Sequence, residues 1–360
     1  MRNFSSRLQT WYKDHRRPLP FRDTQDPYRT WIAEIILQQT RIAQGLPHYE
    51  RFIKTFPKIQ DLALTSEKEV LYLWQGLGYY SRARNLHKGA RYIFYELGGK
   101  FPKTAQAWRR VCGVGPYTAA ALASFLHREK VPTLDGNVFR VATRLFGIAE
   151  PIARSSTRRR IEGLLLDLMP DDDPGEFNQA LMEFGSLHCS PRPKCVSCPF
   201  QTDCYAYLHQ NTGSFPNKGI KKALKDRFFH YILIQQGDKI LFRKRGQKDI
   251  WQGLYEPLLV EREKLCGWDE LKSDLNPCLR KNKPSLISGS VRHVLTHQRL
   301  HIIFFHLSLD KTEDLNKMAS DLEMSAFLPA LIPLPIVLGR YLIREETGTY
   351  GRPKSSATAG

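Results

Sequence analysis

Four of the chain's seven cysteines lie within sixteen residues, in the stretch CSPRPKCVSCPFQTDC. Cys189, Cys195, Cys198 and Cys204 follow the spacing C-x5-C-x2-C-x5-C. Thiolates bind soft metals, and four of them on a short loop can surround one tetrahedral zinc ion or one iron–sulfur cubane. Structural zinc sites usually combine two C-x2-C pairs, whereas this loop holds one pair between two wider arms. The spacing therefore leaves zinc and iron–sulfur open, with unmetallated thiols as a third interpretation.

Disulfides are not expected for these cysteines. The opening stretch MRNFSSRLQTWYKDHRRPLP has neither the apolar segment nor the small-residue cleavage site of a secretory signal, and the cysteine count is odd. We therefore expect a reducing compartment: the cytoplasm with its nucleoid in a bacterium, or the nucleus or mitochondrion of a eukaryote. No run of 18 apolar residues occurs, so we expect no membrane span.

The charge balance favours a polyanionic partner. Lys and Arg number 54 and Asp and Glu 36, which gives a formal net charge of +18 and a pI near 9.6. Counterion release makes such an excess favourable for nucleic-acid binding. No basic amphipathic helix suited to an anionic membrane stands out. The charge therefore predicts a nucleic-acid partner.

A second group of residues could approach a phosphate. The stretch VCGVGPYTAAALASF places Gly113 and Gly115 between two helical patterns, with Pro116 suited to the first turn of the second helix. Such a turn lets backbone amides at a helix N-terminus approach a phosphate with no side chain in the way. Asp135 and Asn137 precede another predicted helix, where Asp135 could act chemically or could simply cap the helix.

Helices must position these groups. Apolar residues recur at three- and four-residue spacing through residues 1–210, for example in WIAEIILQQT, EVLYLWQGL and FNQALMEFGSL. Helix starts are indicated by Asp26 with the proline after it, by Thr65 and by Thr104. The pattern predicts a helical domain.

The second half of the chain has a different pattern. Residues 211–226 are polar, basic and aperiodic, which predicts a linker. The strand-like runs RFFHYILIQQ, KILFRKR and HIIFFHLSL follow, and a turn between the first two predicts a hairpin. A final helix is predicted at IVLGRYLIREE. We expect a second domain over 227–347 and a disordered tail at 348–360.

A helix–hairpin–helix, then LDGNV, then four cysteines near the end of a helical domain together resemble the helix–hairpin–helix glycosylase superfamily. The resemblance implies that the four cysteines hold one 4Fe-4S cluster. The first gap between the cysteines is six residues in that superfamily and five here. Its lyase members carry a lysine on the second hairpin helix, whose amine forms a Schiff base with the sugar. Tyr117 stands at that position, and a phenol cannot form an imine.

The N-terminal half is similar to one family within this superfamily, the adenine DNA glycosylases (MutY family). The stretches LPFRDTQDPYRTWIAEIILQQT and WQGLGYYSRARNLHK carry the resemblance. It implies a double-stranded DNA partner with adenine opposite 8-oxoguanine or guanine. It also implies catalytic roles for Glu34 and Asp135, supported by Tyr117 and Asn137. The residues implied to enter the base stack are Gln39 and Tyr79, and those implied to line the adenine pocket are Arg17, Phe21 (in place of a tryptophan), Arg22, Leu37 and Gln179.

The surroundings of Glu34 allow two interpretations. On a helix, Thr30, Glu34, Gln38 and Arg41 form one polar stripe between apolar residues. The stripe could be solvated, or it could line a pocket whose apolar walls raise the pKa of Glu34 toward neutrality. In the second case Glu34 would protonate a flipped adenine at N7, and Asp135 would stabilise the oxocarbenium-like sugar until water attacks.

The stretch DKILFRKRGQKDIWQGLYEPLL resembles the Nudix-like C-terminal domain of the same family. The glutamate spacing with which Nudix hydrolases hold magnesium is missing after Gly253, so no pyrophosphohydrolase activity is expected. The family reads 8-oxoguanine through a Phe-Ser-His loop, and the match here is Leu295-Thr296-His297. The hydroxyl and the imidazole can recognise 8-oxoguanine, and an ordinary strand turn is the alternative.

We therefore predict a multidomain protein of class α plus α+β. An all-helical helix–hairpin–helix glycosylase domain with an iron–sulfur loop is followed by a Nudix-like α/β domain. The predicted function is that of a monomeric, monofunctional adenine DNA glycosylase of base excision repair. The alternatives are a bifunctional, endonuclease III-like glycosylase-lyase and a non-catalytic iron–sulfur DNA-binding protein.

Overall fold

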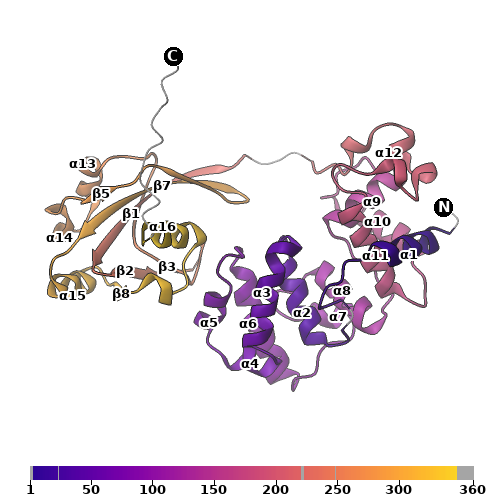
Figure 1. The fold of residues 1–360 in the computed structure, drawn as a ribbon, viewed down its shortest axis with the longest axis horizontal. Coiled ribbons are helices and arrows are strands. Elements are labelled where there is room, and N and C mark those ends of the chain that lie inside the picture. Colours follow the sequence, from indigo (N-terminus) through magenta and orange to yellow (C-terminus); the bar gives the residue numbers. More distant parts are fainter. Residues whose placement is uncertain (1–2, 23, 220–222, 248, 347–360) are drawn as a thin grey trace, which may run out of the picture. The chain divides into compact units, whose positions relative to one another are not determined.

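The chain forms two compact units, each of which is described by itself (Figure 1). The computed structural model describes residues 3–22, 24–219, 223–247 and 249–346. The two units comprise Met1–Leu64 with Asn85–Lys221, and Thr65–Arg84 with Lys222–Gly360. The second unit thus takes in a short segment from the middle of the helical half. The domain bounds expected from the sequence stay predictions, and the tail at 348–360 lies outside the described residues.

The first unit is built of helices, as the apolar periodicity predicts. Its α-helices in the described residues are α1 (Phe4–His15), α2 (Pro27–Leu37), α3 (Ile42–Thr55), α4 (Ile59–Leu64), α6 (Ser81–Arg91, which begins in the second unit), α7 (Ala105–Trp108), α8 (Pro116–His127), α9 (Gly136–Phe146), α10 (Ser155–Leu168), α11 (Pro174–Leu187) and α12 (Tyr205–Leu208). A π-helical turn, η1 (Tyr92–Glu96), continues α6. Two 3₁₀ turns, η2 (Cys195–Ser197) and η3 (Gln201–Asp203), lie in the cysteine loop.

Side-chain caps start several helices where the sequence predicts them. Asp26 accepts a hydrogen bond from the Tyr28 amide at 2.9 Å at the start of α2, and Thr104 caps α7. Helix α5 (Glu67–Leu73) begins one residue later than expected, because Ser66 and Glu69 form a reciprocal capping box. The predicted helix starts are therefore right to within one residue.

One hydrophobic core joins α1, α9 and α11 to the cysteine loop. It is formed by buried side chains such as Phe4 and Leu8 of α1, Phe184 of α11 and Phe200 of the loop. The Phe4 and Phe200 rings are stacked with centroids 4.5 Å apart. Fully burying a side chain of this size contributes about 1.5–3 kcal/mol, so packing anchors the loop against these helices.

The second unit contains an eight-stranded mixed sheet in which β3, β2, β1, β7 and β5 lie in that order. Its strands are β1 (Lys225–Gln236), β2 (Lys239–Lys244), β3 (Tyr255–Glu256), β4 (Leu258–Arg262), β5 (Leu286–Ile287), β6 (Val291–Val294), β7 (Gln298–Ser308) and β8 (Ser325–Phe327). The predicted β1–β2 hairpin is present, with Gln235 opposite Ile240. Strands β1 and β7 pair in parallel along their whole length, which local sequence pattern does not predict.

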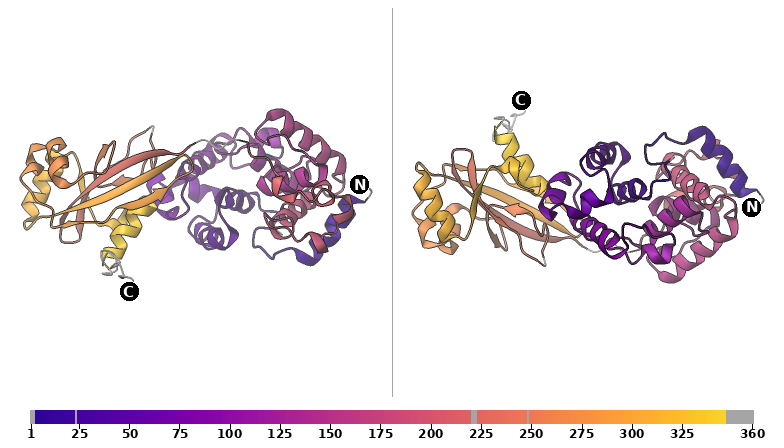
Figure 2. Two further views of the ribbon diagram at one scale, coloured as in Figure 1. Left: turned by 90° about the horizontal axis from the view of Figure 1, so that it is seen from above. Right: turned by 90° about the horizontal axis from the view of Figure 1, so that it is seen from below.

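Helices cover both faces of this sheet. The helices that cover the sheet are α13 (Trp268–Leu271), α14 (Pro277–Arg280), α15 (Thr312–Asp321) and α16 (Ile336–Glu346). Phe229 and Tyr231 of β1 pack into a core with α16, whereas Ile232 and Ile234 pack into a second core with α13, α14 and α15. Figure 2 shows α16 and the other helices on opposite sides of the sheet. Within the described residues, no helix is long and apolar enough to cross a membrane.

Asn178 fixes the segment that leads into α9. Its side chain is 1% exposed, accepts a hydrogen bond from the Thr133 amide at 3.0 Å, and donates to Ser124 Oγ and to the Val131 carbonyl at 2.9 Å each. These hydrogen bonds hold the backbone of segment 131–135 in a fixed position against α11. Any residue at the start of α9 depends on this segment for its position.

We predict that Asn178→Ala lowers the free energy of unfolding by about 2–4 kcal/mol, because it leaves buried backbone groups without partners. The measurement is urea unfolding of the full chain, monitored by the circular dichroism signal of its helices. The control is Gln106→Ala on an exposed position of α7, which should leave the midpoint unchanged. An unfolding midpoint for Asn178→Ala equal to that of the control would contradict the assignment.

Candidate active site

Two helices bring a carboxylic acid and a phenol together. Glu34 lies on α2 and Tyr117 in the first turn of α8, and the Tyr117 hydroxyl donates a hydrogen bond to Glu34 Oε2 at 3.0 Å. The same hydroxyl lies 3.4 Å from the sulfur of Met182 on α11. The polar stripe of α2 is not solvated along its length, since Thr30 is 4% exposed and Gln38 donates to Thr118 at 2.9 Å. Glu34 therefore sits in a partly buried site.

A second carboxylate lies at the start of α9. Asp135 is the N-cap of that helix, and its Oδ1 accepts the Val138 amide at 2.7 Å. Its Oδ2 accepts the Asn137 side-chain amide at 2.8 Å. Asp135 thus fulfils the capping role considered from the sequence. It also has both oxygens held in fixed directions, as a residue that stabilises charge requires.

The two carboxyl groups are electrostatically linked. Burial raises the pKa of Glu34 to about 7, and the negative charge of Asp135 adds to the rise, while the Tyr117 hydrogen bond opposes it. Burial also raises the pKa of Asp135, but hydrogen bonds from the Val138 amide and from Asn137 favour its charged form. The arrangement provides an acid that holds its proton near neutrality beside a carboxylate that is stabilised as an anion.

A third carboxylate, Glu183 of α11, was not predicted from the sequence. Arg17 donates to it through Nε at 2.8 Å and through NH2 at 2.6 Å, and Arg22 NH2 donates at 3.0 Å. Burial alone would raise the pKa of Glu183, but these hydrogen bonds outweigh it and lower the pKa to about 2. Glu183 follows Gln179 by four residues on the same helix, so helical spacing was the signal that could have revealed it.

Of the remaining residues expected in the adenine pocket, Gln179 is connected to this ion cluster through Tyr12. The Tyr12 hydroxyl donates to Gln179 Oε1 at 3.3 Å, and the guanidinium of Arg22 lies over the Tyr12 ring. Phe21 packs edge-on against Tyr49, with ring centroids 5.2 Å apart. Leu37 is partly buried at the end of α2.

The hairpin between α7 and α8 carries the two expected glycines. Gly113 has φ +83°, and a Cβ there would lie 2.7 Å from Asn85, so both the backbone and the space require glycine. Gly115 is exposed at the N-cap of α8, and a Cβ there would meet nothing within 4 Å. The free amides at this helix start can therefore face an incoming phosphate.

The two residues expected to enter the base stack share an unusual backbone. Gln39 has φ 56° and Tyr79 has φ 44°, both in the left-handed region that residues with side chains rarely adopt. Both residues are exposed. Strained, exposed positions of this kind are common at functional sites.

The turn 295–297 connects β6 to β7 in the second unit. Leu295 is partly buried, and Thr296 and His297 are exposed. The Tyr79 hydroxyl forms a hydrogen bond with Thr296 Oγ1, and both residues belong to this unit. The structure therefore brings one residue expected at the base stack next to one expected to read 8-oxoguanine.

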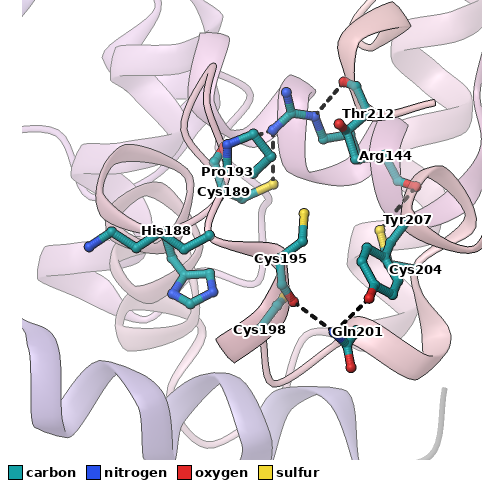
Figure 3. Close-up of a pocket in the computed structure, with 11 residues that line it drawn as sticks. Arg144, His188, Cys189, Pro193, Cys195, Cys198, Gln201, Cys204, Tyr207 and Thr212 are labelled. Atoms are coloured by element: carbon teal, nitrogen blue, oxygen red, sulfur yellow. Dashed lines mark hydrogen bonds between the residues drawn. The ribbon is translucent and has the colours of Figure 1, made fainter. Parts of the chain in front are cut away.

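The four clustered cysteines line one cavity (Figure 3). All four are free thiols. Arg144, which is 2% exposed on α9, donates to Cys189 Sγ at 3.4 Å, and the Phe200 amide donates to Cys198 Sγ at 3.4 Å. Among the described residues, no three His, Cys, Asp or Glu side chains lie close enough together to hold one metal ion, so what the four cysteines share is the cavity that they line.

Two arginines of α9 tie the cysteine loop to the helix that Asp135 caps. Arg140 donates to the Cys189 carbonyl at 2.8 Å and to Asn137 Oδ1 at 2.9 Å. Arg144 donates to the Ser190 carbonyl at 2.7 Å. One helix therefore supports both the candidate catalytic carboxylate and the loop.

Known proteins resemble this chain in sequence and fold. Residues 32–165 match the family described as "HhH-GPD superfamily base excision DNA repair protein", and residues 230–332 match "NUDIX domain". The adenine DNA glycosylase of Buchnera aphidicola subsp. Acyrthosiphon pisum is 33% identical over 83% of this chain and 85% of its own. The adenine DNA glycosylase of Mus musculus is 40% identical over 86% of this chain and 71% of its own. The structure of a thermostable thymine-DNA glycosylase is similar with a TM-score of 0.52 at 30% identity, over 57% of this chain and 95% of its own.

These matches confirm the predicted fold and function. Similarity extends from the helical domain, where Glu34 and Tyr117 meet, into the domain that follows it. The chain belongs to the adenine DNA glycosylase (MutY) family of base excision repair enzymes, with a helix–hairpin–helix glycosylase domain followed by a Nudix domain.

Proposed function

We propose that this DNA glycosylase flips adenine out of a duplex, where it pairs with 8-oxoguanine or guanine, and hydrolyses its N-glycosidic bond. The observation that carries the proposal is the 3.0 Å hydrogen bond between Tyr117 and Glu34, in a site where the charge of Asp135 also acts on Glu34. A group with a pKa of about 7 can donate a proton at physiological pH.

Glu34 acts as the general acid. It transfers its proton to N7 of adenine, and the electron pair of the C1′–N9 bond leaves with the base. The sugar becomes an oxocarbenium-like cation, which the Asp135 carboxylate stabilises at short range. A water oxygen then forms the new bond to C1′ and gives its proton to the Glu34 carboxylate, which restores the acid. Asn137 and the Val138 amide hold Asp135 in place throughout.

The enzyme is proposed to be monofunctional. Tyr117 occupies the position of the lysine that forms a Schiff base in the lyase members of the superfamily, and it is engaged with Glu34. A phenol cannot form an imine with the sugar. Strand cleavage by a lysine-dependent route is therefore not expected.

Two ion-paired arginines and their neighbours are proposed to bind the flipped adenine. Glu183 holds Arg17 and Arg22 at fixed positions and can itself accept a hydrogen bond from the exocyclic amine of adenine. The other proposed pocket residues are Phe21, Leu37 and Gln179. Gln39 and Tyr79 would enter the base stack, and the amides beside Gly113 and Gly115 would bind DNA phosphate.

The turn 295–297 is proposed to read 8-oxoguanine. This base differs from guanine by an oxygen at C8 and a proton on N7, so its recognition needs hydrogen-bonding groups at that edge. Thr296 supplies a hydroxyl and His297 an imidazole, and both are exposed. Leu295 supplies an apolar contact.

The four clustered cysteines fit one 4Fe-4S cluster, because all four free thiols line one cavity. Burial raises the pKa of Cys198 to about 12, so a positively charged group is needed to keep that sulfur as a thiolate. When bound, the cluster would supply this charge and would fasten the 189–204 loop. We also propose that the enzyme acts as a monomer on chromosomal DNA.

The test of the catalytic proposal is adenine release from an adenine:8-oxoguanine duplex in single turnover. Glu34→Gln should bind the duplex but slow release by about 10²–10⁴-fold, because it cannot donate a proton. The wild-type rate should fall about tenfold per pH unit above a pKa of about 7, as Glu34 loses its proton. Glu50→Gln, an exposed glutamate on α3, is the control.

A Glu34→Gln rate close to wild type would refute the role of Glu34. Alkali treatment after incubation separates the alternatives. Strand breaks before alkali would indicate a lyase, and no breaks after alkali would indicate a protein that only binds.

The cluster prediction concerns metal content. Purified protein should be brown and contain about four irons per chain. Cys198→Ser should lose most of this iron, whereas Cys278→Ser in the second unit should retain it. The check is elemental analysis of anaerobically prepared protein, and stoichiometric zinc without iron would show the assignment to be wrong.

The recognition prediction concerns Thr296. Thr296→Ala should weaken the preference for 8-oxoguanine over guanine about two- to tenfold, because one neutral hydrogen bond is lost. Thr296→Ser should retain the preference, and the double variant Thr296→Ala, His297→Ala should lose more of it. Affinity and single-turnover rate on both duplexes, at one salt concentration, provide the measurement. Equal preference in the double variant and the wild type would exclude this turn as the reader.

A further inference from the structure

His188 is a buried imidazole with an unused hydrogen-bonding atom. It directly precedes Cys189, its side chain is 7% exposed, and its Nε2 has no hydrogen-bond partner among the described residues. A buried polar nitrogen without a partner costs free energy, so native structures rarely keep one. A partner that is not a protein atom would remove this cost.

Aromatic packing fixes the orientation of the ring. It stacks nearly parallel on Phe184, with centroids 5.0 Å apart and an interplanar angle of 13°. The Trp11 ring meets it edge-on at 5.9 Å. The backbone is also held, because the Lys194 amide donates to the His188 carbonyl at 3.1 Å. The imidazole is therefore confined beside the cysteine loop.

His188 is one of the residues that line the cavity of the four cysteines. Figure 3 shows the imidazole and the Arg144 side chain on different sides of Cys195. Arg144 already donates to Cys189 Sγ and the Phe200 amide to Cys198 Sγ, each at 3.4 Å. The cavity thus has donors directed at its sulfur atoms, and His188 can add one more.

We propose that His188 donates a hydrogen bond from Nε2 to a sulfur of the 4Fe-4S cluster, either a cysteine thiolate or an inorganic sulfide. The inference rests on the cofactor proposed above. A donor at sulfur withdraws electron density and stabilises the more negative, reduced cluster, so it raises the reduction potential. It also makes oxidative loss of iron slower. His188 is a positioning and tuning residue and takes no part in adenine release.

The decisive variant is His188→Phe, which keeps an aromatic ring for stacking on Phe184 but has no N–H. We expect its reduction potential to shift to a more negative value than that of the wild type. Its cluster should be lost in air about 10-fold faster, as is usual when a partner of a metal ligand is removed. His188→Gln, which retains an N–H donor, should recover part of both properties.

His15→Phe is the matched control. The His15 ring also stacks on Trp11, at 4.7 Å, but its Nδ1 bonds to the Trp11 carbonyl at 2.8 Å and it does not line the cavity. This variant should leave the potential and the cluster half-life unchanged. If His188→Phe behaves like His15→Phe in both measurements, the inference is wrong.

A spectroscopic measurement covers the case in which His188→Phe loses its cluster during purification. Wild-type protein labelled with ¹⁵N-histidine should show magnetic coupling between the reduced cluster and a histidine nitrogen in pulsed electron paramagnetic resonance. Its absence would overturn the inference. Iron-free wild-type protein would instead overturn the cofactor proposal itself, which the iron analysis detects separately from adenine release.

Discussion

The hydrogen bonds of Arg140 and Arg144 to the cysteine loop fix the position of that loop relative to α9 in the first unit. Both side chains extend from α9 to backbone carbonyls of residues 185–191. Arg144 is almost fully buried, and a guanidinium is tolerated there because several carbonyl oxygens share its charge. Since Asp135 caps the same helix, any displacement of the loop would be passed along a rigid element to the carboxylate.

Glu34 and Glu183 show how one side-chain type takes two chemical states in one unit. Burial would raise the pKa of both. Glu34 meets a neutral phenol and a negative neighbour, so its pKa stays near 7, whereas Glu183 meets two guanidinium groups and is ionised at every physiological pH. The identity of the partner, more than the degree of burial, determines which glutamate can transfer a proton and which can only hold a charge.

Local pattern predicted the helices and strands well, because caps and periodicity are local properties. Asp26 and Thr104 start their helices as expected, and the β1–β2 hairpin is present. The candidate catalytic residues were identified by resemblance, since the polar stripe of α2 by itself also fits a solvated face. Periodicity could not show that Tyr79 meets Thr296, because the two residues are 217 positions apart and their contact depends on tertiary packing. Glu183 was missed for a similar reason: only its two arginines distinguish it from an ordinary buried polar residue.

The central strand β1 sends alternate side chains into two separate cores, one beneath α16 and one beneath α13, α14 and α15. An insertion or deletion of one residue within Phe229–Ile234 would exchange the two faces and place each side chain in the wrong core. A change of length is therefore better tolerated at a turn such as Gly237, where φ is positive and the chain is free of both cores. The same constraint identifies these turns as the places where a fusion or a tag could be inserted without disturbing the sheet.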